Sequence, residues 1–240
     1  MGNLFIMEEY TDINLMLLVI PARKGSKGIK DKNLIKFNGL HLVEHTMLAA
    51  QETIKLMPEY SLMVTTDCPY VTDLAHQHKI HVAKRPHSLS NDNSTLDQVI
   101  CHIAKNYKEF DSFMCLPPTS PLRSSDHIIK AINIYNQNNA QSLLSVTEEH
   151  KTIWTVNDVI YGTRIYPKPG NPLVNRQLSK HCYISNGAIT ITSRIILEKL
   201  KCRYGGKTIP YQMPKINSID IDTYEDLEIA EAFVSQFKKS

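Results

Sequence analysis

A short cationic loop is the part of this sequence best suited to binding phosphate. The apolar run from Leu15 to Ile20 stops at Pro21 and gives way to a loop that contains Gly25 and Gly28. Small residues let backbone N–H groups approach a phosphate, and cations neutralise its charge. The loop therefore predicts a polyphosphate site, with a solvated basic turn as the alternative. Its polar and cationic residues are Arg23, Lys24, Ser26, Lys27, Lys30, Lys32 and Asn33.

Two acidic residues near the end of the chain form the best candidate for a metal site. Asp220 and Asp222 flank Ile221, and residues i and i+2 of a strand point to the same face. Their carboxylates then converge, while Ile221 points into the core. Mg²⁺ typically takes one or two carboxylates and completes its shell with phosphate and water. The alternative is that Asp222 only begins the last helix and Asp220 is an exposed strand residue.

Better-known catalytic signatures are missing from the sequence. The loop lacks both the GxxxxGK[ST] pattern and the three-glycine dinucleotide fingerprint. Ser26 lacks a G-x-S-x-G context, and no Cys/His pairing is evident. His76, His78 and His81 straddle an expected change from helix to strand, so we expect them to diverge. The absence of a nucleophile triad from the sequence favours direct displacement, in which the protein positions and neutralises the reactants and forms no covalent intermediate.

Strand and helix signals alternate along most of the chain, and this predicts a mostly parallel, doubly wound α/β sheet with helices on both faces. Strands are expected at 15–20, 61–65, 80–83, 113–116, 142–146, 183–192 and 218–221. Helices are expected at 41–54, 69–78, 94–107, 124–135, 193–199 and 223–237. Thr223 should cap the last helix, with Asp226 three residues later.

Ligands of such sheets sit beyond the carboxyl ends of the strands. The sequence therefore predicts one rim where four loops gather, at 23–33, 66–67, 85–92 and 117–123. The stretch from Glu148 to His181 is rich in turn formers and reads as an excursion from the sheet, a hairpin or a dimer-forming lobe. We interpret residues 1–240 as a single domain, with an extension at 1–14 and the excursion at about 148–182.

The bulk composition narrows the class of protein. The chain has 240 residues, 42% of them hydrophobic, and a formal net charge of +3, which suits a small anionic substrate and argues against a nucleic-acid partner. Five cysteines without a C-x-x-C pair suggest neither disulfides nor zinc, which favours a reducing cytoplasm. No segment has the roughly 20 apolar residues of a membrane span. Glu8, Glu9 and Asp12 do not fit a signal peptide.

Five motifs resemble those of the acylneuraminate cytidylyltransferase family, in the family's order and over residues 15–235. They are LLVIPARKGSKGIKDKN (17–33), KRPHSLSNDNSTLD (84–97), LPPTSPLR (116–123), NRQLSKHCYISNGAITI (175–191) and INSIDIDTYEDLEIAE (216–231). The resemblance implies a Rossmann-like nucleotide-diphospho-sugar transferase fold with a small dimerisation excursion, and a homodimer. It also implies the coupling of CTP to a nonulosonic acid, which is a nine-carbon 2-keto sugar acid, with release of pyrophosphate.

The resemblance also implies roles for individual residues. It places Mg²⁺ or Mn²⁺ on Asp220 and Asp222, which with Arg23 and Lys32 would be the catalytic residues. The residues implied to bind CTP are Arg23, Gly25, Ser26, Lys27, Lys32, Asn33, Arg85, Ser94 and Thr95. The second motif is one residue shorter than the family's commonest version between Asp92 and Ser94. The sequence therefore does not decide which hydroxyl reaches the nucleoside.

The implied sugar-binding residues are Ser120, Lys151, Arg176, Gln177 and Asn186. For Lys151 and Arg176 a solvated cation is the alternative. Two positions depart from the family: Pro117 replaces a glutamine that reaches the sugar, and Thr190 replaces a tyrosine.

The first loop has the SKG…KN form that separates the nine-carbon group from the enzymes for the eight-carbon acid Kdo. The choice among sialic, legionaminic and pseudaminic acids stays open. Two alternatives remain, a cytidylyltransferase for another sugar and a homologue that binds nucleotide without catalysis.

Overall fold

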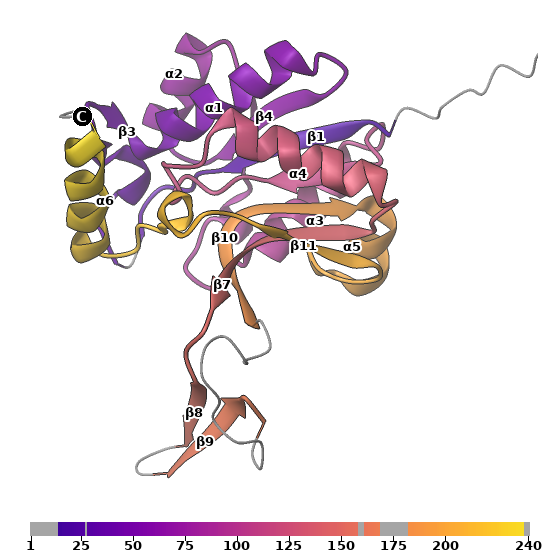
Figure 1. The fold of residues 1–240 in the computed structure, drawn as a ribbon. Helices are drawn as coiled ribbons and strands as arrows, with labels where there is room; N and C mark the ends of the chain where they lie inside the picture. Colours follow the sequence, from indigo (N-terminus) through magenta and orange to yellow (C-terminus); the bar gives the residue numbers. More distant parts are fainter. Residues whose placement is uncertain (1–13, 27, 158–160, 169–181, 238–240) are drawn as a thin grey trace, which may run out of the picture.

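The computed structural model describes residues 14–26, 28–157, 161–168 and 182–237. Its centre is a seven-stranded sheet in the order β11-β7-β10-β6-β1-β4-β5 (Figure 1). The strands are β1 (Met16–Pro21), β4 (Ser61–Thr66), β5 (His81–Lys84), β6 (Ser112–Cys115), β7 (Ser142–Glu149), β10 (Cys182–Ser193) and β11 (Thr208–Gln212). β10 runs antiparallel to both of its neighbours, and the other neighbouring pairs are parallel. The predicted mostly parallel α/β sheet is confirmed.

Helices form where helical spacing predicts them, with ends that differ from the prediction by at most two residues. They are α1 (Leu42–Leu56), α2 (Pro69–Gln77), α3 (Leu96–Asn106), α4 (Ser125–Gln137), α5 (Arg194–Leu200) and α6 (Tyr224–Phe237). Short 3₁₀ helices lie at η1 (Lys32–Leu34), η2 (His87–Leu89) and η4 (Lys215–Ser218). None of the helices in the described part of the chain is long and apolar enough to cross a membrane.

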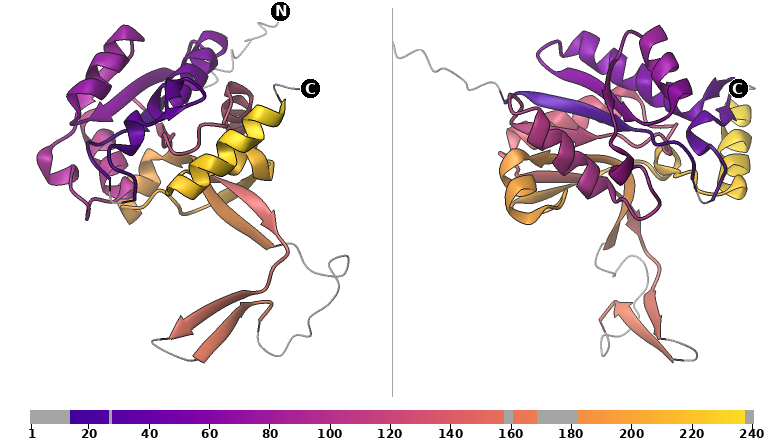
Figure 2. Two further views of the ribbon diagram at one scale, coloured as in Figure 1. Left: turned by 90° about the vertical axis from the view of Figure 1, so that its left-hand side faces the viewer. Right: turned by 180° about the vertical axis from the view of Figure 1, so that it is seen from behind.

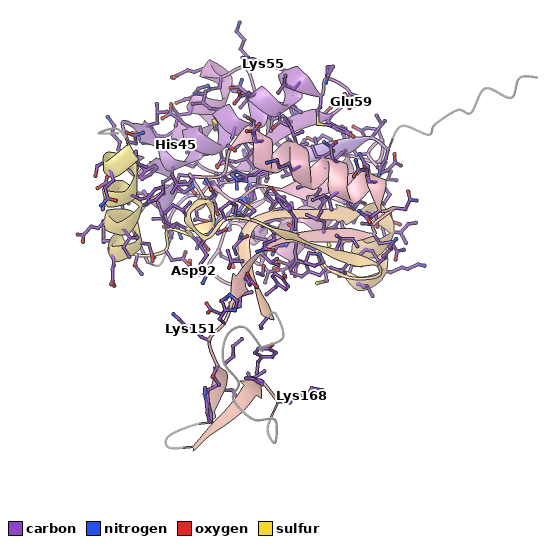
Figure 3. The ribbon with its side chains drawn as sticks, viewed as in Figure 1. His45, Lys55, Glu59, Asp92, Lys151 and Lys168 are labelled. Carbon is purple, nitrogen blue, oxygen red and sulfur yellow. The ribbon has the colours of Figure 1, made fainter. Side chains whose placement is uncertain are left out.

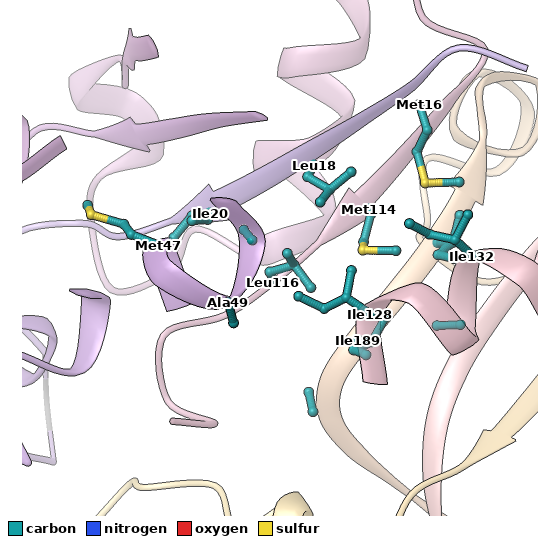
Figure 4. Close-up of a cluster of buried hydrophobic side chains, with 14 of the residues drawn as sticks. Met16, Leu18, Ile20, Met47, Ala49, Met114, Leu116, Ile128, Ile132 and Ile189 are labelled. Atoms are coloured by element: carbon teal, nitrogen blue, oxygen red, sulfur yellow. The ribbon is translucent and has the colours of Figure 1, made fainter. Parts of the chain in front are cut away.

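The central strand β1 is buried on both faces, and its side chains alternate between two helical layers. Leu18 and Ile20 pack in the same cluster as Met47 of α1 and Ile128 of α4 (Figure 4). Leu17 and its neighbour Val19 belong to a second cluster with residues of α3 and α5. Because side chains alternate along a strand, a continuous apolar run fits only a sheet covered on both sides. The prediction of helices on both faces is therefore confirmed.

The last helix packs against the cationic loop rather than against the sheet. Ile221 is fully buried in a cluster with Ile29 of that loop, Ala230 of α6 and other apolar residues. The Thr223 hydroxyl accepts from the Asp226 amide (3.2 Å), and the Asp226 carboxylate accepts from the Thr223 amide (2.8 Å). This reciprocal pair is the predicted helix cap. The cap and the buried Ile221 fix the two acidic residues beside the loop.

Two assignments near the end of the chain differ from the sequence analysis. The predicted strand at 218–221 is wrong, because a 3₁₀ helix ends at Ser218 and the Ile221 amide donates to the Thr119 carbonyl of a loop (2.8 Å). The position at the edge of the sheet is taken by β11, which pairs with β7 and which the sequence analysis missed. Pro210 lies within β11, and proline is tolerated in edge strands because one side of the strand has no partner.

A hairpin of β8 (Ile153–Asn157) and β9 (Tyr161–Tyr166) extends away from the sheet beyond the ends of β7 and β10 (Figures 1 and 2). We call this hairpin the arm. It lies in the stretch predicted to leave the sheet. A smaller hairpin is formed by β2 (Lys36–Phe37) and β3 (Leu40–His41) beside α1.

Candidate active site

A pocket of about 350 Å³ lies at the carboxyl ends of the parallel strands. The predicted site residues that line it are Arg23, Gly25, Ser26, Lys32, Asn33, Arg85, Ser94, Asp220 and Asp222. The other lining residues are Pro21, Leu96, Val99, Pro117, Pro118, Thr119, Gly187, Arg203 and Tyr204. A larger groove between α3 and α5 contains none of those predicted residues that the structure describes. The fold therefore brings residues of all five motifs, the acidic pair among them, together at the predicted rim.

The cationic loop is held in its turn by its own polar groups and by the neighbouring loops. Arg23 Nη2 lies 2.7 Å from Asp92 Oδ1, and the Asn33 amide group donates to the Arg23 carbonyl (2.9 Å). The Ser26 hydroxyl donates to the Ile29 carbonyl and accepts from the Lys32 amide. Gly25 has φ +69°, a left-handed conformation that favours glycine. These bonds fix the cations of the loop at the pocket.

The loop and the acidic pair touch each other at two points. Lys32 Nζ lies 2.5 Å from Asp222 Oδ1. A Cβ atom on Gly28 would lie 2.5 Å from the Asp222 carbonyl oxygen, a distance that requires a backbone shift. Gly28 therefore allows an approach of the two backbones that no other residue would permit.

Asp220 and Asp222 both line the pocket, as the strand-like alternation around Ile221 predicts. Loss of solvation raises the pKa of Asp220 above its ordinary value, and the negative charge of Asp222 raises it further. The hydrogen bond from Thr119 and the positive charge of Lys32 lower this pKa but do not cancel the rise. A Cβ atom on Gly187 would lie 3.6 Å from Asp220 Oδ2, so the absence of a side chain leaves that oxygen accessible. Two adjacent carboxylates, of which Asp220 is partly desolvated and Asp222 is exposed, are a donor set that suits a hard divalent cation.

Arg85 is 4% exposed, and its guanidinium reaches the pocket from beside β4. Its Nη2 donates to the Thr65 carbonyl (3.0 Å), while its buried Nε has no hydrogen-bond partner in the described part of the chain. Burial lowers its pKa to about 10, partly offset by Asp67, so the group is still a cation at neutral pH. A buried cation with an unused donor is costly to maintain without an anionic ligand.

Arg123 is a structural residue of the site that the sequence analysis did not single out. Only 2% of it is exposed, and its Nη1 donates to the carbonyls of Pro117 (3.0 Å) and Ala188 (2.8 Å). Its Nη2 donates to the Thr46 hydroxyl (2.7 Å). Burial lowers the pKa of Arg123 to about 10, so it also carries a charge at neutral pH. Arg123 ties the loop after β6 to β10 and to α1.

Four predicted residues lie outside the pocket lining. Thr95 is the N-cap of α3 and accepts from the Gln98 amide (3.2 Å). Ser120 is buried, with no hydrogen-bond partner for its hydroxyl among the described residues. Asn186 accepts from the Ser145 hydroxyl (2.5 Å) and so supports the bulge in β10. Lys151 is exposed beside the arm and does not line the pocket (Figure 3). Lys27, Arg176 and Gln177 lie outside the described residues.

The structure adds residues from the β6–β10 side of the pocket to the predicted site residues; two of them lie within the motifs and two lie outside them. Thr119 bonds to Asp220, and Gly187 lies in the bulge of β10. Arg203 and Tyr204 follow α5, and Arg203 contacts Asp97 and Thr190. The available signal was an arginine and a tyrosine between a helix and a Gly-Gly pair, which is too common to assign.

The pocket has two sides that follow the order of the strands. We call the side made by Arg23, Gly25, Ser26, Lys32, Asn33 and Arg85 the β1 wall. The side made by Pro117, Pro118, Thr119, Gly187, Arg203 and Tyr204 is the β10 wall. Asp222 touches the first wall and Asp220 the second. Arg85 is anchored at β4 and Arg203 at β10, three strand spacings apart, which is about 14 Å.

Comparison with solved structures agrees with the overall fold. The structure of CMP:2-keto-3-deoxy-manno-octonic acid synthetase complexed with CTP superposes with a TM-score of 0.67 at 16% identity, covering 92% of this chain and 98% of that one. A 4-diphosphocytidyl-2C-methyl-D-erythritol synthase from Anaerococcus prevotii gives a TM-score of 0.65 at 13% identity, covering 92% and 96%. At these identities the likeness concerns the fold alone, and it is the nucleotide-diphospho-sugar transferase fold.

Sequence comparison then gives the family. The cytidylyltransferase family matches residues 17–239, and the chain belongs to that family. It is 30% identical over 213 residues to the N-acylneuraminate cytidylyltransferase of Streptococcus agalactiae serotype V, covering 88% of this chain and 51% of that protein. It is 31% identical over 224 residues to the CMP-N,N′-diacetyllegionaminic acid synthase of Legionella pneumophila, covering 90% and 94%. The chain thus spans about half the length of the streptococcal relative and nearly all of the Legionella one.

Proposed function

We propose that this protein couples CTP to a nine-carbon 2-keto sugar acid and releases pyrophosphate. The observation that carries the proposal is one pocket in which a cationic loop and a buried, incompletely paired Arg85 face two adjacent carboxylates. Cations on one side suit the phosphates of a nucleotide, and the carboxylates suit a divalent ion. The names of the streptococcal and Legionella relatives support CTP and a nonulosonic acid as the substrates.

In this proposal the β1 wall binds CTP. Arg23, Lys32 and the backbone amides near Gly25 neutralise the phosphates. The other CTP-binding residues proposed in this loop are Ser26, Asn33 and Lys27, which lies outside the described residues. Arg85 donates hydrogen bonds to the bound CTP. Ser94 and Thr95 lie at the start of α3, where one of their hydroxyls contacts the nucleoside. Positioning of this kind lowers the barrier because charge that develops during the reaction meets groups already in place.

The acceptor lies along the β10 wall, so that its anomeric hydroxyl reaches the α-phosphorus beside the acidic pair. The new bond joins that oxygen to the α-phosphorus, the bond from this phosphorus to the bridging oxygen breaks, and pyrophosphate leaves as the hydroxyl proton is lost. Asp220 and Asp222 would hold Mg²⁺ or Mn²⁺, and such an ion supplies positive charge and lowers the pKa of a hydroxyl. The proposed residues for binding the sugar acid are Ser120, Lys151, Arg176, Gln177 and Asn186.

The proposal is tested by measuring pyrophosphate release with CTP and Mg²⁺ against sialic, legionaminic and pseudaminic acids, with Kdo as the eight-carbon control. We expect release with at least one nine-carbon acid and none with Kdo. If no acid gives pyrophosphate release while CTP still binds, the result would support the alternative that the protein is a homologue that binds nucleotide without catalysis. Release with Kdo alone would place the chain with the eight-carbon enzymes.

We also propose that the protein forms a homodimer through its arm. Trp154 and Ile165 of the hairpin are 57% and 54% exposed, and Ile184 at the outer end of β10 is 41% exposed. Burying such side chains against a second copy removes apolar area from water. Light scattering on the wild type should give twice the chain mass, and Trp154→Ser should shift it toward the monomer. Tyr70→Ser, at a still more exposed aromatic on α2 (72%), is the control; a monomeric wild type would refute the proposal.

A further inference from the structure

Arg203 is the described cation on the β10 wall of the pocket. It hydrogen-bonds to Thr190 of β10, whereas the cations Arg23, Lys32 and Arg85 belong to the β1 wall. If CTP occupies the β1 wall, as proposed above, Arg203 lies where the acceptor must sit. The following inference therefore rests on the proposed function.

The guanidinium of Arg203 is fixed before any ligand arrives. Its Nε lies 2.6 Å from Asp97 Oδ1, and its Nη1 lies 3.5 Å from the Thr190 hydroxyl. Its central carbon lies 5.5 Å from the centre of the Tyr204 ring. The side chain is 14% exposed, so it is accessible from the pocket without being free to move. A donor held in this way loses little side-chain entropy on binding.

The charge of Arg203 is already balanced, and this separates it from Arg85. Asp97 sits in direct contact with Arg203, so the pair presents N–H donors with almost no net charge. Arg85 hydrogen-bonds to a backbone carbonyl and keeps its charge available to a ligand. A second carboxylate arriving at Arg203 would have to compete with Asp97 and meet its repulsion. A neutral oxygen meets no such repulsion and still accepts a hydrogen bond.

The neighbouring residues leave this role to Arg203. Pro117 has neither a polar side chain nor an N–H with which to donate, and the Thr119 hydroxyl is engaged by Asp220. Thr190 lies behind Arg203 and is 1% exposed. Apart from the Tyr204 hydroxyl, Arg203 is the side chain of the β10 wall placed to donate a hydrogen bond to an acceptor molecule.

We propose that Arg203 is a specificity-determining residue that donates a hydrogen bond to a neutral carbonyl oxygen of the acceptor, such as that of an acylamino substituent. It selects among sugar acids by this substituent and does not bind their carboxylate. A buried donor left without its partner is costly, so an acceptor that lacks the carbonyl is penalised.

The test compares acceptors with and without the carbonyl. N-acetylneuraminate and N,N′-diacetyllegionaminate are the acylated probes, and the deaminated analogue of neuraminate, with a hydroxyl in place of the acetamido group, is the probe without it. In Arg203→Met we expect kcat/KM for the preferred acylated acid to fall by about 10- to 100-fold, the range for a hydrogen bond from a charged donor. For the deaminated analogue it should change less than about threefold, and the KM for CTP should not move. Arg203→Lys should fall between.

Lys201→Met is the matched control, because it removes a cation two residues away that does not line the pocket. It should keep the acceptor preference of the wild type. An equal fall for both kinds of acceptor in Arg203→Met, or a rise in the KM for CTP, would overturn the inference while the proposed function stands.

If the wild type releases no pyrophosphate with any acid, the proposed function fails, and the preference is then measured as binding. Calorimetry with CTP present should show tighter binding of the acylated acids to the wild type and no such preference in Arg203→Met. Absence of binding by both kinds of acid to the wild type would refute the inference as well.

Discussion

The two walls of the pocket use arginine in opposite ways. On the β1 wall Arg85 is buried, its Nε has no partner among the residues that the structure describes, and its charge is available to a ligand. On the β10 wall Arg203 is paired with Asp97 at 2.6 Å, and its charge is balanced before a ligand binds. The first arrangement suits phosphates, which any CTP-using enzyme must hold. The second suits discrimination between acceptors. In the proposed function, the same side chain thus serves affinity or selectivity according to whether a carboxylate lies beside it.

The largest expected effect is at the junction of the walls. Asp222→Ala should lower kcat by roughly 10³-fold or more. The substitution would remove a ligand of the proposed divalent ion, and with the ion the charge that neutralises the carboxylates and the phosphates would be lost from both walls. Asp222 is exposed, so circular dichroism and the Tm should stay near those of the wild type. Glu225→Ala removes a carboxylate of α6 that does not line the pocket and should leave kcat unchanged. Near wild-type turnover of Asp222→Ala with Mg²⁺ would show the metal assignment to be wrong.

A substitution of Arg85 separates binding from stability. Arg85→Met should raise the KM for CTP by about 10- to 100-fold, because a charge-assisted hydrogen bond is lost. The Tm should not fall, since a buried cation without a carboxylate partner costs stability. Lys84→Met, at the adjacent exposed cation, is the control and should change neither the KM for CTP nor the Tm. A lower Tm with an unchanged KM for CTP would make Arg85 a structural residue, and the contrast between the walls would fail.

Gly28 tests how closely the β1 wall must approach the acidic pair. In Gly28→Ala the new Cβ atom meets the Asp222 carbonyl oxygen, so the loop must move. Displacements of about 1 Å cost up to about 10²-fold in rate, and we expect kcat to fall by about 10- to 100-fold. Gly39→Ala imposes strain at a positive φ in the β2–β3 hairpin, outside the pocket, and should lower the Tm without lowering kcat. Unchanged turnover in Gly28→Ala would mean that the loop and the pair act independently.

The smallest expected effect concerns stability and pH. The pKa of Asp220 is raised in the folded protein, so between the ordinary value of 3.8 and the raised value the folded state binds more protons than the unfolded chain. Stability therefore falls as pH rises through this window, and above it the ionised carboxylate costs stability. Asp220→Asn should melt at a higher temperature than the wild type at pH 7, measured without divalent ions. The difference should shrink as the pH is lowered toward 3.8.

Added Mg²⁺ should raise the Tm of the wild type at pH 7 more than that of Asp220→Asn, because the ion binds the folded state through the carboxylate. A variant that melts below the wild type at pH 7 without divalent ions would show that the carboxylate stabilises the fold.

The sequence by itself determined the alternation of strands and helices, the cationic loop and the acidic pair. These are local features: a buried strand is a continuous apolar run, a loop carries its charges in consecutive residues, and Asp220 and Asp222 flank a buried isoleucine whether or not the segment is a strand. The strand predicted at 218–221 was wrong, yet the alternation of its side chains was right.

Only the tertiary structure decided which cations are paired. Asp97 lies 106 residues before Arg203, and Arg123 clamps carbonyls from β10 and from its own loop. No spacing along the chain encodes such contacts, because they exist only once β10 has entered the sheet antiparallel between β6 and β7. The edge strand β11 was missed for a similar reason, since its proline argues against a strand until its place at the sheet edge is known. Chemistry carried by neighbouring residues can be read from the sequence, and chemistry that depends on charge balance between distant residues requires the fold.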